Sequence, residues 1–558
     1  MKTKISRREF NLTVAAGTLG LISGCSIKNR FDILIKNGLI IDGSGTQAFK
    51  KDIGLIGNRI VAIDDLKSAT ADMIIDAENL VVSPGFIDIH THTDIELIVN
   101  SKAESKIHQG VTTEVSGNCG YSPFPLNDID FRELDKNTFE EYGIHIDWRN
   151  IDGFLRKLED QKISINYATF TGHGNLRSYV LGKNDIQATP EQLKEMKDIL
   201  ERSMADGSFG LSTGLEYAPG SYSSTTELIE LNKIVARNGG IHATHIRSED
   251  DHVEEAIQEA IQICKQAEVS TQISHLKACN FANWDKVDNI LEMIHTAADS
   301  GMPVKADRYP YIAYGTGLTM FLPLWSRQGS TEEILSRLQD KAVLQKIEDY
   351  VEDKGQGIGG WDRVVISSCF SEKNRLWEGK SVHACAVELS TTPFEFIRNI
   401  LLEEKNRVQI VGFGMDENNL KKVLSSSLVM IGSDGTAVAP YGKLAEGKPH
   451  PRYFGTFPRV LGKYSRDDKI FDLVTAVQKM TSMPAEKLGL QKRGLIAKDY
   501  FADIVLFNPE TVIDNASFVD PHQFPSGIEY VIINGEISIK NGKHTGAQAG
   551  TVLRHRSL

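Results

Sequence analysis

Two histidines separated by one residue are the strongest chemical signal in the sequence. His90 and His92 follow a mostly apolar run that begins at Gly85. On a β-strand the side chains of residues i and i+2 project from the same face, so both imidazoles can reach one ion. An H-x-H pair alone is a weak signal, because most such pairs bind no metal. It indicates a metal site only if further ligands follow at the ends of other strands.

Further ligands do follow. His245, His275 and Asp434 each close a strand-like run, and Cys119 lies in the turn after the strand-like segment 111–115. Imidazole, thiolate and carboxylate groups at separate strand ends are typical of a zinc site with one position open for water. Zinc lowers the pKa of that water to roughly 7 and polarises a carbonyl group. The pattern predicts hydrolysis, with Asp434 as the general base that passes the proton to a leaving amine.

The elements that must position these residues alternate between strands and helices over residues 83–483. One amphipathic helix begins near Pro190 and another spans Val253–Ala267. This alternation favours an α/β fold, a (β/α)8 TIM barrel with its chemistry at the carboxyl ends of the strands. A doubly wound sheet is the alternative, but no glycine-rich nucleotide-binding loop supports it. A charged, helix-rich stretch at about 318–362 predicts an insertion on one barrel loop.

Short strands with turn residues between them flank the predicted barrel on both sides. Residues 31–82 contain the turn Asn37-Gly38, and residues 484–550 contain the turn Asn534-Gly535. Dipeptides of this kind are typical of hairpins. We therefore expect one small β-sandwich domain formed from both ends of the chain.

Composition narrows the possible partners. A hydrophobic content of 41% and a charged content of 24% fit a globular protein. The net charge of −12 leaves no basic surplus for binding phosphate backbones, which argues against a nucleic-acid partner. The six cysteines form no C-x-x-C pair, which argues against a disulfide scaffold or a zinc ribbon.

The first 25 residues have the pattern of an export signal. Arg7 and Arg8 precede Phe10 and a short apolar stretch over residues 12–22, which resembles a twin-arginine signal. The segment that ends at Cys25 resembles a bacterial lipobox, which would place lipid on that cysteine. We expect an exported protein of the bacterial cell envelope, on the periplasmic side, that contacts a membrane only through its N-terminal lipid.

Eight motifs, taken together, carry a family resemblance. They are P-G-F-I-D-I-H-T-H at Pro84–His92, G-N-C-G at Gly117–Gly120, G-L-S-T-G-L at Gly210–Leu215, T-H-I-R-S-E at Thr244–Glu249, S-H-L-K at Ser274–Lys277, D-R-Y-P-Y at Asp307–Tyr311, G-S-D-G at Gly432–Gly435 and H-P-R-Y-F-G at His450–Gly455. On these motifs the chain resembles the D-aminoacylase (N-acyl-D-amino-acid deacylase) branch of the amidohydrolase superfamily. The resemblance runs from about Phe31 to Gly550.

The resemblance implies two metal positions and a reaction. The tight zinc site is formed by Cys119, His245 and His275, and the weaker second site by His90 and His92 with Cys119 as the bridge. Hydantoinase-like relatives bridge their metals with a carbamylated lysine, but residues 167–173 contain none. The implied reaction is hydrolysis of the amide bond of an N-acyl-D-amino acid to a carboxylate and a free D-amino acid, with Asp434 as the acid/base.

A cationic clamp is expected for the free carboxylate of this small-molecule substrate. Lys277 lies two residues after His275, so on a continuing strand both side chains face one pocket. The resemblance nominates Lys277, Tyr309 and Arg452 for the clamp, although Tyr311 is an equally local choice. Glu216 departs from the pattern, because a charged residue stands where the resemblance predicts an apolar one.

Two alternative functions remain. The first is an amidohydrolase of another amide, such as a dipeptide or a cyclic amide; the absence of the middle-strand lysine argues against the cyclic amide. The second is a lipid-anchored, non-catalytic binding protein with a decayed active site, and the complete ligand set argues against it.

Several other polar residues have competing interpretations. We expect His242 to be structural and His108 to be solvated or to cap a helix. His173 either lines the pocket or lies in a surface loop. Asp88 either orients a ligand histidine or satisfies a buried hydrogen bond.

Overall fold

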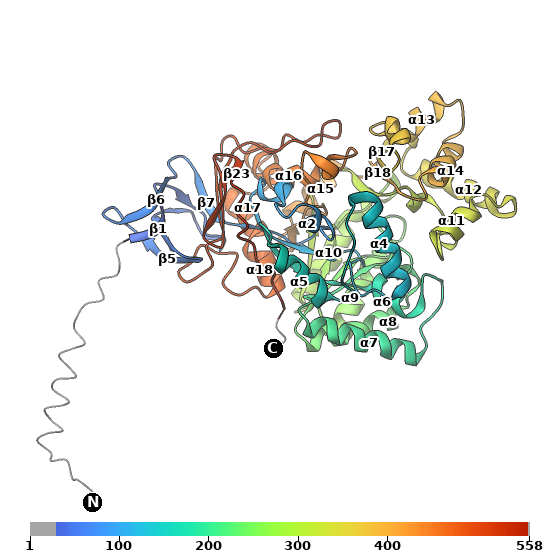
Figure 1. The fold of residues 1–558 in the computed structure, drawn as a ribbon, viewed down its shortest axis with the longest axis horizontal. Helices are drawn as coiled ribbons and strands as arrows, with labels where there is room; N and C mark the ends of the chain where they lie inside the picture. Colours follow the sequence, from blue (N-terminus) through green and yellow to red (C-terminus); the bar gives the residue numbers. More distant parts are fainter. Residues whose placement is uncertain (1–29, 556–558) are drawn as a thin grey trace, which may run out of the picture.

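The computed structural model describes residues 30–555 (Figure 1). The predicted export signal, with its lipobox Cys25, lies outside the described residues. Among residues 30–555, no helix is long and apolar enough to cross a membrane.

Eight strand positions form a closed parallel barrel, which confirms the predicted fold class. Hydrogen bonds from Phe170 to Ser116 and from Phe209 to Thr169 join β10 and β11 into one position of the ring. A parallel bridge between Thr91 and Gly435 closes the ring between its last and first strands. In chain order the strands are β8 (Phe86–Asp88), β9 (Val111–Ser116), β10 (Asn166–Thr169) with β11 (Thr171–Gly172), β12 (Gly210–Gly214), β13 (Ile241–His245), β14 (Ser270–Ile273), β15 (Val304–Arg308) and β19 (Val429–Ile431).

Helices cover the outside of the barrel because each has one apolar face. In α9 (Val253–Ala267), the buried residues include Ile257, Ile261 and Cys264, which recur at helical spacing. In α7 (Pro190–Ala205), Thr189 and the first-turn glutamine form a capping box, and Pro190 takes the first helical position. Both helices lie where the sequence predicts them.

Both ends of the chain build the β-sandwich domain. The N-terminal strand β7 (Val81–Pro84) pairs antiparallel with the C-terminal strand β20 (Ile504–Phe507), so one seven-stranded sheet contains both ends. A four-stranded sheet from the N-terminal segment packs against it around a shared apolar core. The four-stranded sheet contains β1 (Arg30–Lys36), β4 (Asp52–Ile56), β5 (Arg59–Asp64) and β6 (Thr70–Asp76); the seven-stranded sheet adds β2 (Leu39–Ile40), β3 (Phe49–Lys50), β21 (Ile528–Ile533), β22 (Glu536–Lys540) and β23 (Lys543–His544).

The boundary between barrel and sandwich differs slightly from the expected one. Helices α17 (Leu473–Met480) and α18 (Ser482–Leu488) pack against β8, so the barrel continues to Leu488 rather than ending at residue 483. The segment after the sandwich returns to the barrel, where Val552 forms a bridge with Tyr167.

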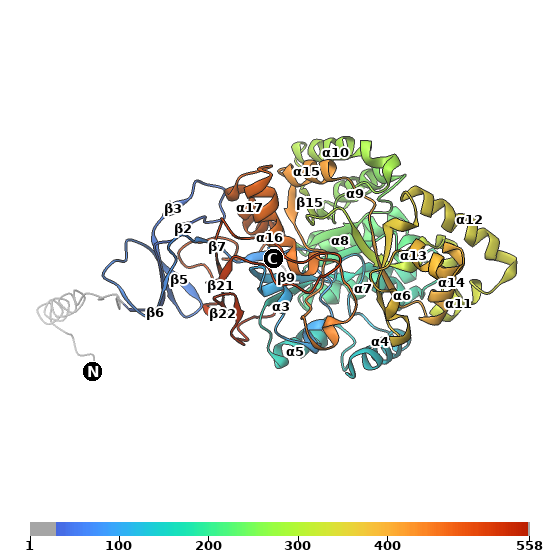
Figure 2. The same cartoon turned by 90° about the horizontal axis from the view of Figure 1, so that it is seen from above.

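An inserted lobe follows β15, and the expected range 318–362 is too short for it. The lobe runs from Tyr314 to Gly412 and has its own apolar core. The second half of the lobe was not predicted, because its apolar helices and strands have the same periodicity as a barrel unit. Figure 2 shows the lobe and the sandwich on opposite sides of the barrel. Its elements are β16 (Tyr314–Gly317), α11 (Thr331–Arg337), α12 (Lys341–Gly357), β17 (Val364–Cys369), α13 (Val382–Glu388), α14 (Pro393–Glu403) and β18 (Val408–Gly412).

Candidate metal centre

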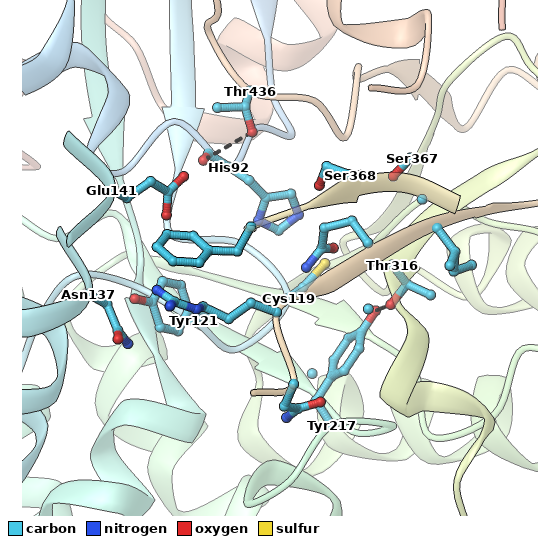
Figure 3. Close-up of a pocket in the computed structure, with 18 of the residues that line it drawn as sticks. His92, Cys119, Tyr121, Asn137, Glu141, Tyr217, Thr316, Ser367, Ser368 and Thr436 are labelled. Carbon is cyan, nitrogen blue, oxygen red and sulfur yellow. Dashed lines mark hydrogen bonds between the residues drawn. The ribbon is translucent and has the colours of Figure 1, made fainter. Parts of the chain in front are cut away.

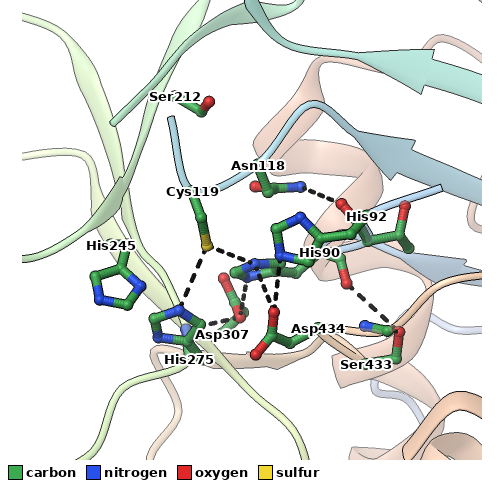
Figure 4. Close-up of polar contacts among 12 residues, drawn as sticks. His90, His92, Asn118, Cys119, Ser212, His245, His275, Asp307, Ser433 and Asp434 are labelled. Carbon is green, nitrogen blue, oxygen red and sulfur yellow. Dashed lines mark hydrogen bonds and ion pairs between the residues drawn. The ribbon is translucent and has the colours of Figure 1, made fainter. Parts of the chain in front are cut away.

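Loops at the carboxyl ends of the barrel strands bring four of the predicted residues together. The ligand atoms of His90, Cys119, His275 and Asp434 all lie within 4.8 Å of one another (Figure 4). The Cys119 Sγ lies 3.3 Å from His90 Nε2 and 3.5 Å from His275 Nε2. The His90 Nε2 lies 3.4 Å from the Asp434 carboxylate. A thiol, two imidazoles and a carboxylate at this spacing are a donor set suited to zinc.

The other two predicted ligands flank this group. His92 Nε2 lies 3.0 Å from Asp434 Oδ1, just beyond the end of β8. The His245 ring lies 4.6 Å from that of His275, nearly perpendicular to it. His245 is buried, yet within residues 30–555 neither ring nitrogen makes a hydrogen bond of normal geometry. A buried imidazole without a hydrogen-bond partner is unfavourable, and a metal ion would satisfy it.

Three residues of the group have a left-handed backbone. The φ angles of Cys119, His275 and Asp434 are 52°, 36° and 49°. Residues other than glycine rarely adopt this conformation, because Cβ then meets neighbouring backbone atoms. Backbone strain of this kind gathers at functional sites. Its presence at three of the converging residues supports a functional role for the cluster.

Two carboxylates that the sequence analysis did not single out contact two of the predicted ligand histidines. Asp307 lies 2.9 Å from His90 Nδ1 and also accepts a hydrogen bond from the His275 backbone at 2.9 Å. Glu249 lies 2.8 Å from His275 Nδ1. In metal sites such a carboxylate fixes the ring and leaves the other nitrogen free for the ion. Both acids belong to quoted motifs at strand ends, so their position was the available signal.

The charges of the cluster favour a cation. Burial raises the pKa of Cys119, but the nearby His90 and His275 hold it well below the ordinary thiol range. Burial likewise raises the pKa of Asp434, but the Arg452 guanidinium and His90 lower it well below its usual value. The thiol and the carboxyl are therefore ionised at neutral pH. Despite burial, these anions raise the pKa of His90 and raise that of His92 to about 9, so a metal ion would bind by displacing protons from the rings.

The cluster opens into a cavity of about 1040 Å³ between the barrel and the inserted lobe. His92, Cys119 and Tyr217 line its barrel side, and Thr316 and Ser368 line its lobe side (Figure 3). The lobe thus forms one wall of the candidate active site.

The three nominated clamp residues differ in their position relative to the cavity: one lines it and two lie behind its wall. Arg452 lines the cavity, and its Nη1 lies 2.9 Å from Asp434 Oδ2. Lys277 and Tyr309 lie behind the wall, where Lys277 Nζ is 2.5 Å from Glu249. The Tyr309 ring packs 4.7 Å from the Arg452 guanidinium.

Tyr309 and Tyr311 differ in the hydrogen bonds that their hydroxyl groups make. The Tyr309 hydroxyl has no hydrogen-bond partner within residues 30–555. By contrast, Tyr311 donates to Asp514 at 3.1 Å, away from the clamp. His450 was missed by the sequence analysis; its Nδ1 accepts from the Arg452 backbone N–H at 3.0 Å and so fixes the start of α16 (Arg452–Arg459).

The remaining polar candidates are structural in this fold. His242 is buried against Thr213 at 3.1 Å, and burial lowers its pKa to about 3. His173 is buried against Glu227 at 2.8 Å, so it lies neither on the cavity wall nor in a surface loop.

The structure decides between the open interpretations of two further residues. Asp88 accepts hydrogen bonds from the Ser433 backbone at 2.8 Å and from Lys106 at 2.9 Å, so it satisfies buried donors rather than orienting a histidine ring. Of the two interpretations of His108, solvation is wrong, because the side chain is buried and stacks on Phe524 at 3.7 Å. Capping is confirmed, because His108 is the C-cap of α3 (Glu104–Ile107) and its Nδ1 lies 2.8 Å from the Glu104 carbonyl oxygen. Its helix packs against the C-terminal half of the chain, a contact that local sequence does not reveal.

Comparison with known proteins decides the family. A D-aminoacylase from Alcaligenes xylosoxydans xylosoxydans is 35% identical over 534 residues, which cover 94% of this chain and 97% of that protein. An N-acyl-D-glutamate deacylase from the same organism is 32% identical over 91% of this chain and 94% of its own length. The chain belongs to the D-aminoacylase family. A sequence model of the amidohydrolase family matches residues 73–273 and 403–539, and the gap between them contains most of the inserted lobe.

The family also appears among solved structures. The crystal structure of N-acyl-D-glutamate deacylase from Bordetella bronchiseptica superposes with a TM-score of 0.79 at 29% identity, covering 94% of this chain and all of that one. That structure contains zinc and a phosphonate inhibitor that mimics the tetrahedral intermediate of the reaction. This chain therefore shares the barrel, the sandwich and a metal-dependent hydrolytic chemistry with other members of the family.

Proposed function

We propose that this chain is a zinc-dependent hydrolase that cleaves the amide bond of N-acyl-D-amino acids to give a carboxylate and a free D-amino acid. One observation carries the proposal: a thiol and several imidazoles converge beside Asp434, and that carboxylate is paired with the cavity arginine Arg452. The relatives named above hydrolyse substrates of this class, which supports the same chemistry here.

The residues suit zinc in number and type. Cys119, His245 and His275 would hold the tight ion, and His90 and His92, with Cys119 as the bridge, would hold a second one. The buried Nδ1 of His245, which has no hydrogen-bond partner within residues 30–555, fits this assignment. A bound zinc ion would polarise the scissile carbonyl and lower the pKa of a water molecule.

Asp434 is placed to move the proton. Its Oδ1 faces His92 at 3.0 Å and its Oδ2 faces Arg452 at 2.9 Å, so the carboxylate lies between the metal ligands and the clamp. It takes a proton from the water that attacks the carbonyl carbon. It then gives that proton to the amine nitrogen as the carbon–nitrogen bond breaks.

Arg452 is the clamp residue nearest the substrate. Its guanidinium lines the cavity and can form two parallel hydrogen bonds with a carboxylate. Lys277 and Tyr309 support it from behind the wall, where cations surround the Tyr309 ring: Arg308 at 4.1 Å, Arg452 at 4.7 Å and Lys277 at 5.9 Å. This concentration of positive charge favours a substrate with a free carboxylate next to the scissile amide.

A hydrolysis screen tests the proposal. The purified protein is offered matched N-acetyl-D- and N-acetyl-L-amino acids, with added zinc and with a chelator, and Asp434→Asn serves as the inactive control. We expect turnover of D-isomers alone and its loss with chelator. Zinc-loaded protein that turns over neither isomer would refute the deacylase function and favour dipeptides or cyclic amides as substrates.

A separate proposal concerns location. The sequence of residues 1–25 supports export through a twin-arginine-type signal and lipid attachment at Cys25, with the enzyme on the periplasmic side of a bacterial envelope. Fractionation of cells and mass spectrometry of the mature N-terminus test this. A lipid-modified Cys25 in the membrane fraction is expected, and release by Cys25→Ala is the control. An unprocessed N-terminus in the cytoplasmic fraction would contradict it.

A further inference from the structure

Two ligand histidines share one arrangement. His90 turns Nε2 toward Cys119 at 3.3 Å and Nδ1 toward Asp307 at 2.9 Å. His275 turns Nε2 toward Cys119 at 3.5 Å and Nδ1 toward Glu249 at 2.8 Å. In each ring one nitrogen faces the thiol and the other faces a carboxylate. A carboxylate in this position fixes the tautomer and the orientation of a metal-binding imidazole.

His245, the other histidine of the proposed tight site, also has a carboxylate beside one ring nitrogen, but that nitrogen is Nε2 rather than Nδ1. Its buried Nδ1, which has no hydrogen-bond partner within residues 30–555, is then the nitrogen left for the metal ion. His245 Nε2 lies 3.4 Å from Glu216 Oε2, closer than its 4.0 Å distance to Glu249. Figure 4 shows the His245 ring beside His275 at the edge of the cluster. We propose that Glu216 is the positioning residue that orients His245 for metal binding. This inference rests on the proposed zinc dependence and assigns a role to the residue that departs from the family pattern.

The surrounding contacts hold Glu216 in place for that role. Its Oε1 accepts a hydrogen bond from the Glu249 backbone N–H at 2.8 Å, which leaves Oε2 free to face His245. Its backbone carbonyl accepts a hydrogen bond from Arg327 of the inserted lobe at 3.1 Å. The next residue, Tyr217, packs edge-on against the His245 ring at 4.8 Å. The loop after β12 therefore fixes both the ring and the carboxylate.

A different interpretation is a separate metal site on this side of the cluster. His245, Glu249 and His275 offer ligand atoms within 4.8 Å of one another, and Glu216 would be a fourth ligand. However, Lys277 Nζ lies 2.5 Å from Glu249 and 3.0 Å from His275 Nδ1. An ammonium group already neutralises that position and would repel an added cation. The two glutamates therefore act as hydrogen-bond acceptors behind the ligands rather than as ligands.

Zinc affinity tests the role without any substrate. Metal-depleted Glu216→Ala, Glu216→Gln and the parent are titrated with zinc against a chromophoric chelator. Glu216→Ala should bind zinc about 10- to 100-fold more weakly, the cost typical of losing such a partner. Glu216→Gln should fall between the two, because its amide oxygen can occupy the place of the carboxylate beside His245 Nε2 without the charge. Asp250→Asn is the control, since that neighbouring acid pairs with Lys354 at 2.6 Å and faces no ligand.

Three outcomes would overturn the proposal. Zinc affinity of Glu216→Ala within twofold of the parent would remove the positioning role. An equal loss of thermal stability in the metal-free and zinc-loaded variant would make Glu216 a structural residue only. A zinc-loaded crystal structure with a Glu216 oxygen at about 2.0–2.2 Å from the ion would make it a ligand. Failure of the deacylase function would leave all three measurements intact, because none of them uses a substrate.

Discussion

Two pairs of carboxyl groups, all buried except the half-buried Glu96, differ in charge: one pair is ionised and the other is neutral. In the first pair, Asp434 and Glu249, burial raises the pKa, but Arg452 and Lys277 outweigh it and the pKa of each carboxyl falls well below its usual value. In the second pair, Glu96 and Glu114, burial raises the pKa of each to about 8. We call these the charged pair and the neutral pair.

The difference shows that a cationic partner, and not the depth of burial, decides the charge of these acids. Lys106 lies near Glu114 but is hydrogen-bonded to Asp88 at 2.9 Å. The charged pair contacts the proposed ligand His275 and the proposed clamp residues Lys277 and Arg452, and it adds negative charge where a metal ion is expected. Neither acid of the neutral pair belongs to the groups of possible metal ligands within residues 30–555. Each of the following substitutions tests one side of this comparison.

The largest effect is expected from Asp434→Asn in the charged pair. The amide has nearly the same shape but cannot accept a proton, so kcat should fall by about 10²- to 10⁴-fold. Steady-state hydrolysis of an N-acetyl-D-amino acid measures this. Zinc content, determined in parallel, must match the parent for the loss to be assigned to proton transfer. A kcat within tenfold of the parent would remove Asp434 from the mechanism.

Glu249→Gln should have the next largest effect. The substitution removes the charge that neutralises Lys277 and weakens the contact that orients His275. Zinc affinity should fall about 10- to 100-fold. Competition with a chelator measures it, and Glu114→Gln from the neutral pair is the matched control. Equal zinc affinity in both variants would show that the charged pair has no special relation to the metal.

Arg452→Lys should have a smaller effect. Lysine keeps the positive charge that Asp434 requires but loses the planar pair of donors that suits a carboxylate. We expect kcat/KM to fall about tenfold, mainly through KM, while the zinc content stays constant. Michaelis–Menten kinetics on one D-substrate measure it. A selective loss of kcat would instead place Arg452 in the chemical step.

The same comparison explains what the sequence could predict. The positions of His90, His245 and Asp434 at strand ends were predictable, because the strand-like runs before them could be read from the sequence and the barrel brings those ends together. Glu249 and Asp307 were not singled out, because their roles depend on the direction in which a loop carboxylate points, and local periodicity does not encode it.

The inserted lobe is a second, larger feature that local sequence patterns were not sufficient to predict. Its range was underestimated because α14 and β18 follow the pattern of a barrel unit. Only the antiparallel pairing of β18 with β16 and β17, which depends on contacts distant in the sequence, separates this segment from the barrel. The alternation of strands and helices was sufficient to predict the barrel but not to count which units belong to it.

The smallest effect on activity is expected from Glu114→Gln, whose effect should appear in the pH dependence of stability. In the unfolded chain this carboxyl loses its proton near pH 4.5, whereas in the folded protein burial holds the pKa at about 8. The folded state binds more protons between these values, so this contribution to stability is complete at low pH and is lost as pH rises through 8. Glutamine mimics the protonated acid and removes the dependence.

Thermal unfolding from pH 6 to pH 9 measures this effect. The parent should lose on the order of 3 kcal/mol more stability than Glu114→Gln over that range, since each pKa unit corresponds to about 1.4 kcal/mol. Glu195→Gln, which changes an exposed acid on α7, should follow the parent at every pH. Parallel curves for the parent and Glu114→Gln would mean that Glu114 is ionised in the folded protein. The neutral pair would then be a second charged pair, and the cation that compensates it would have to be found.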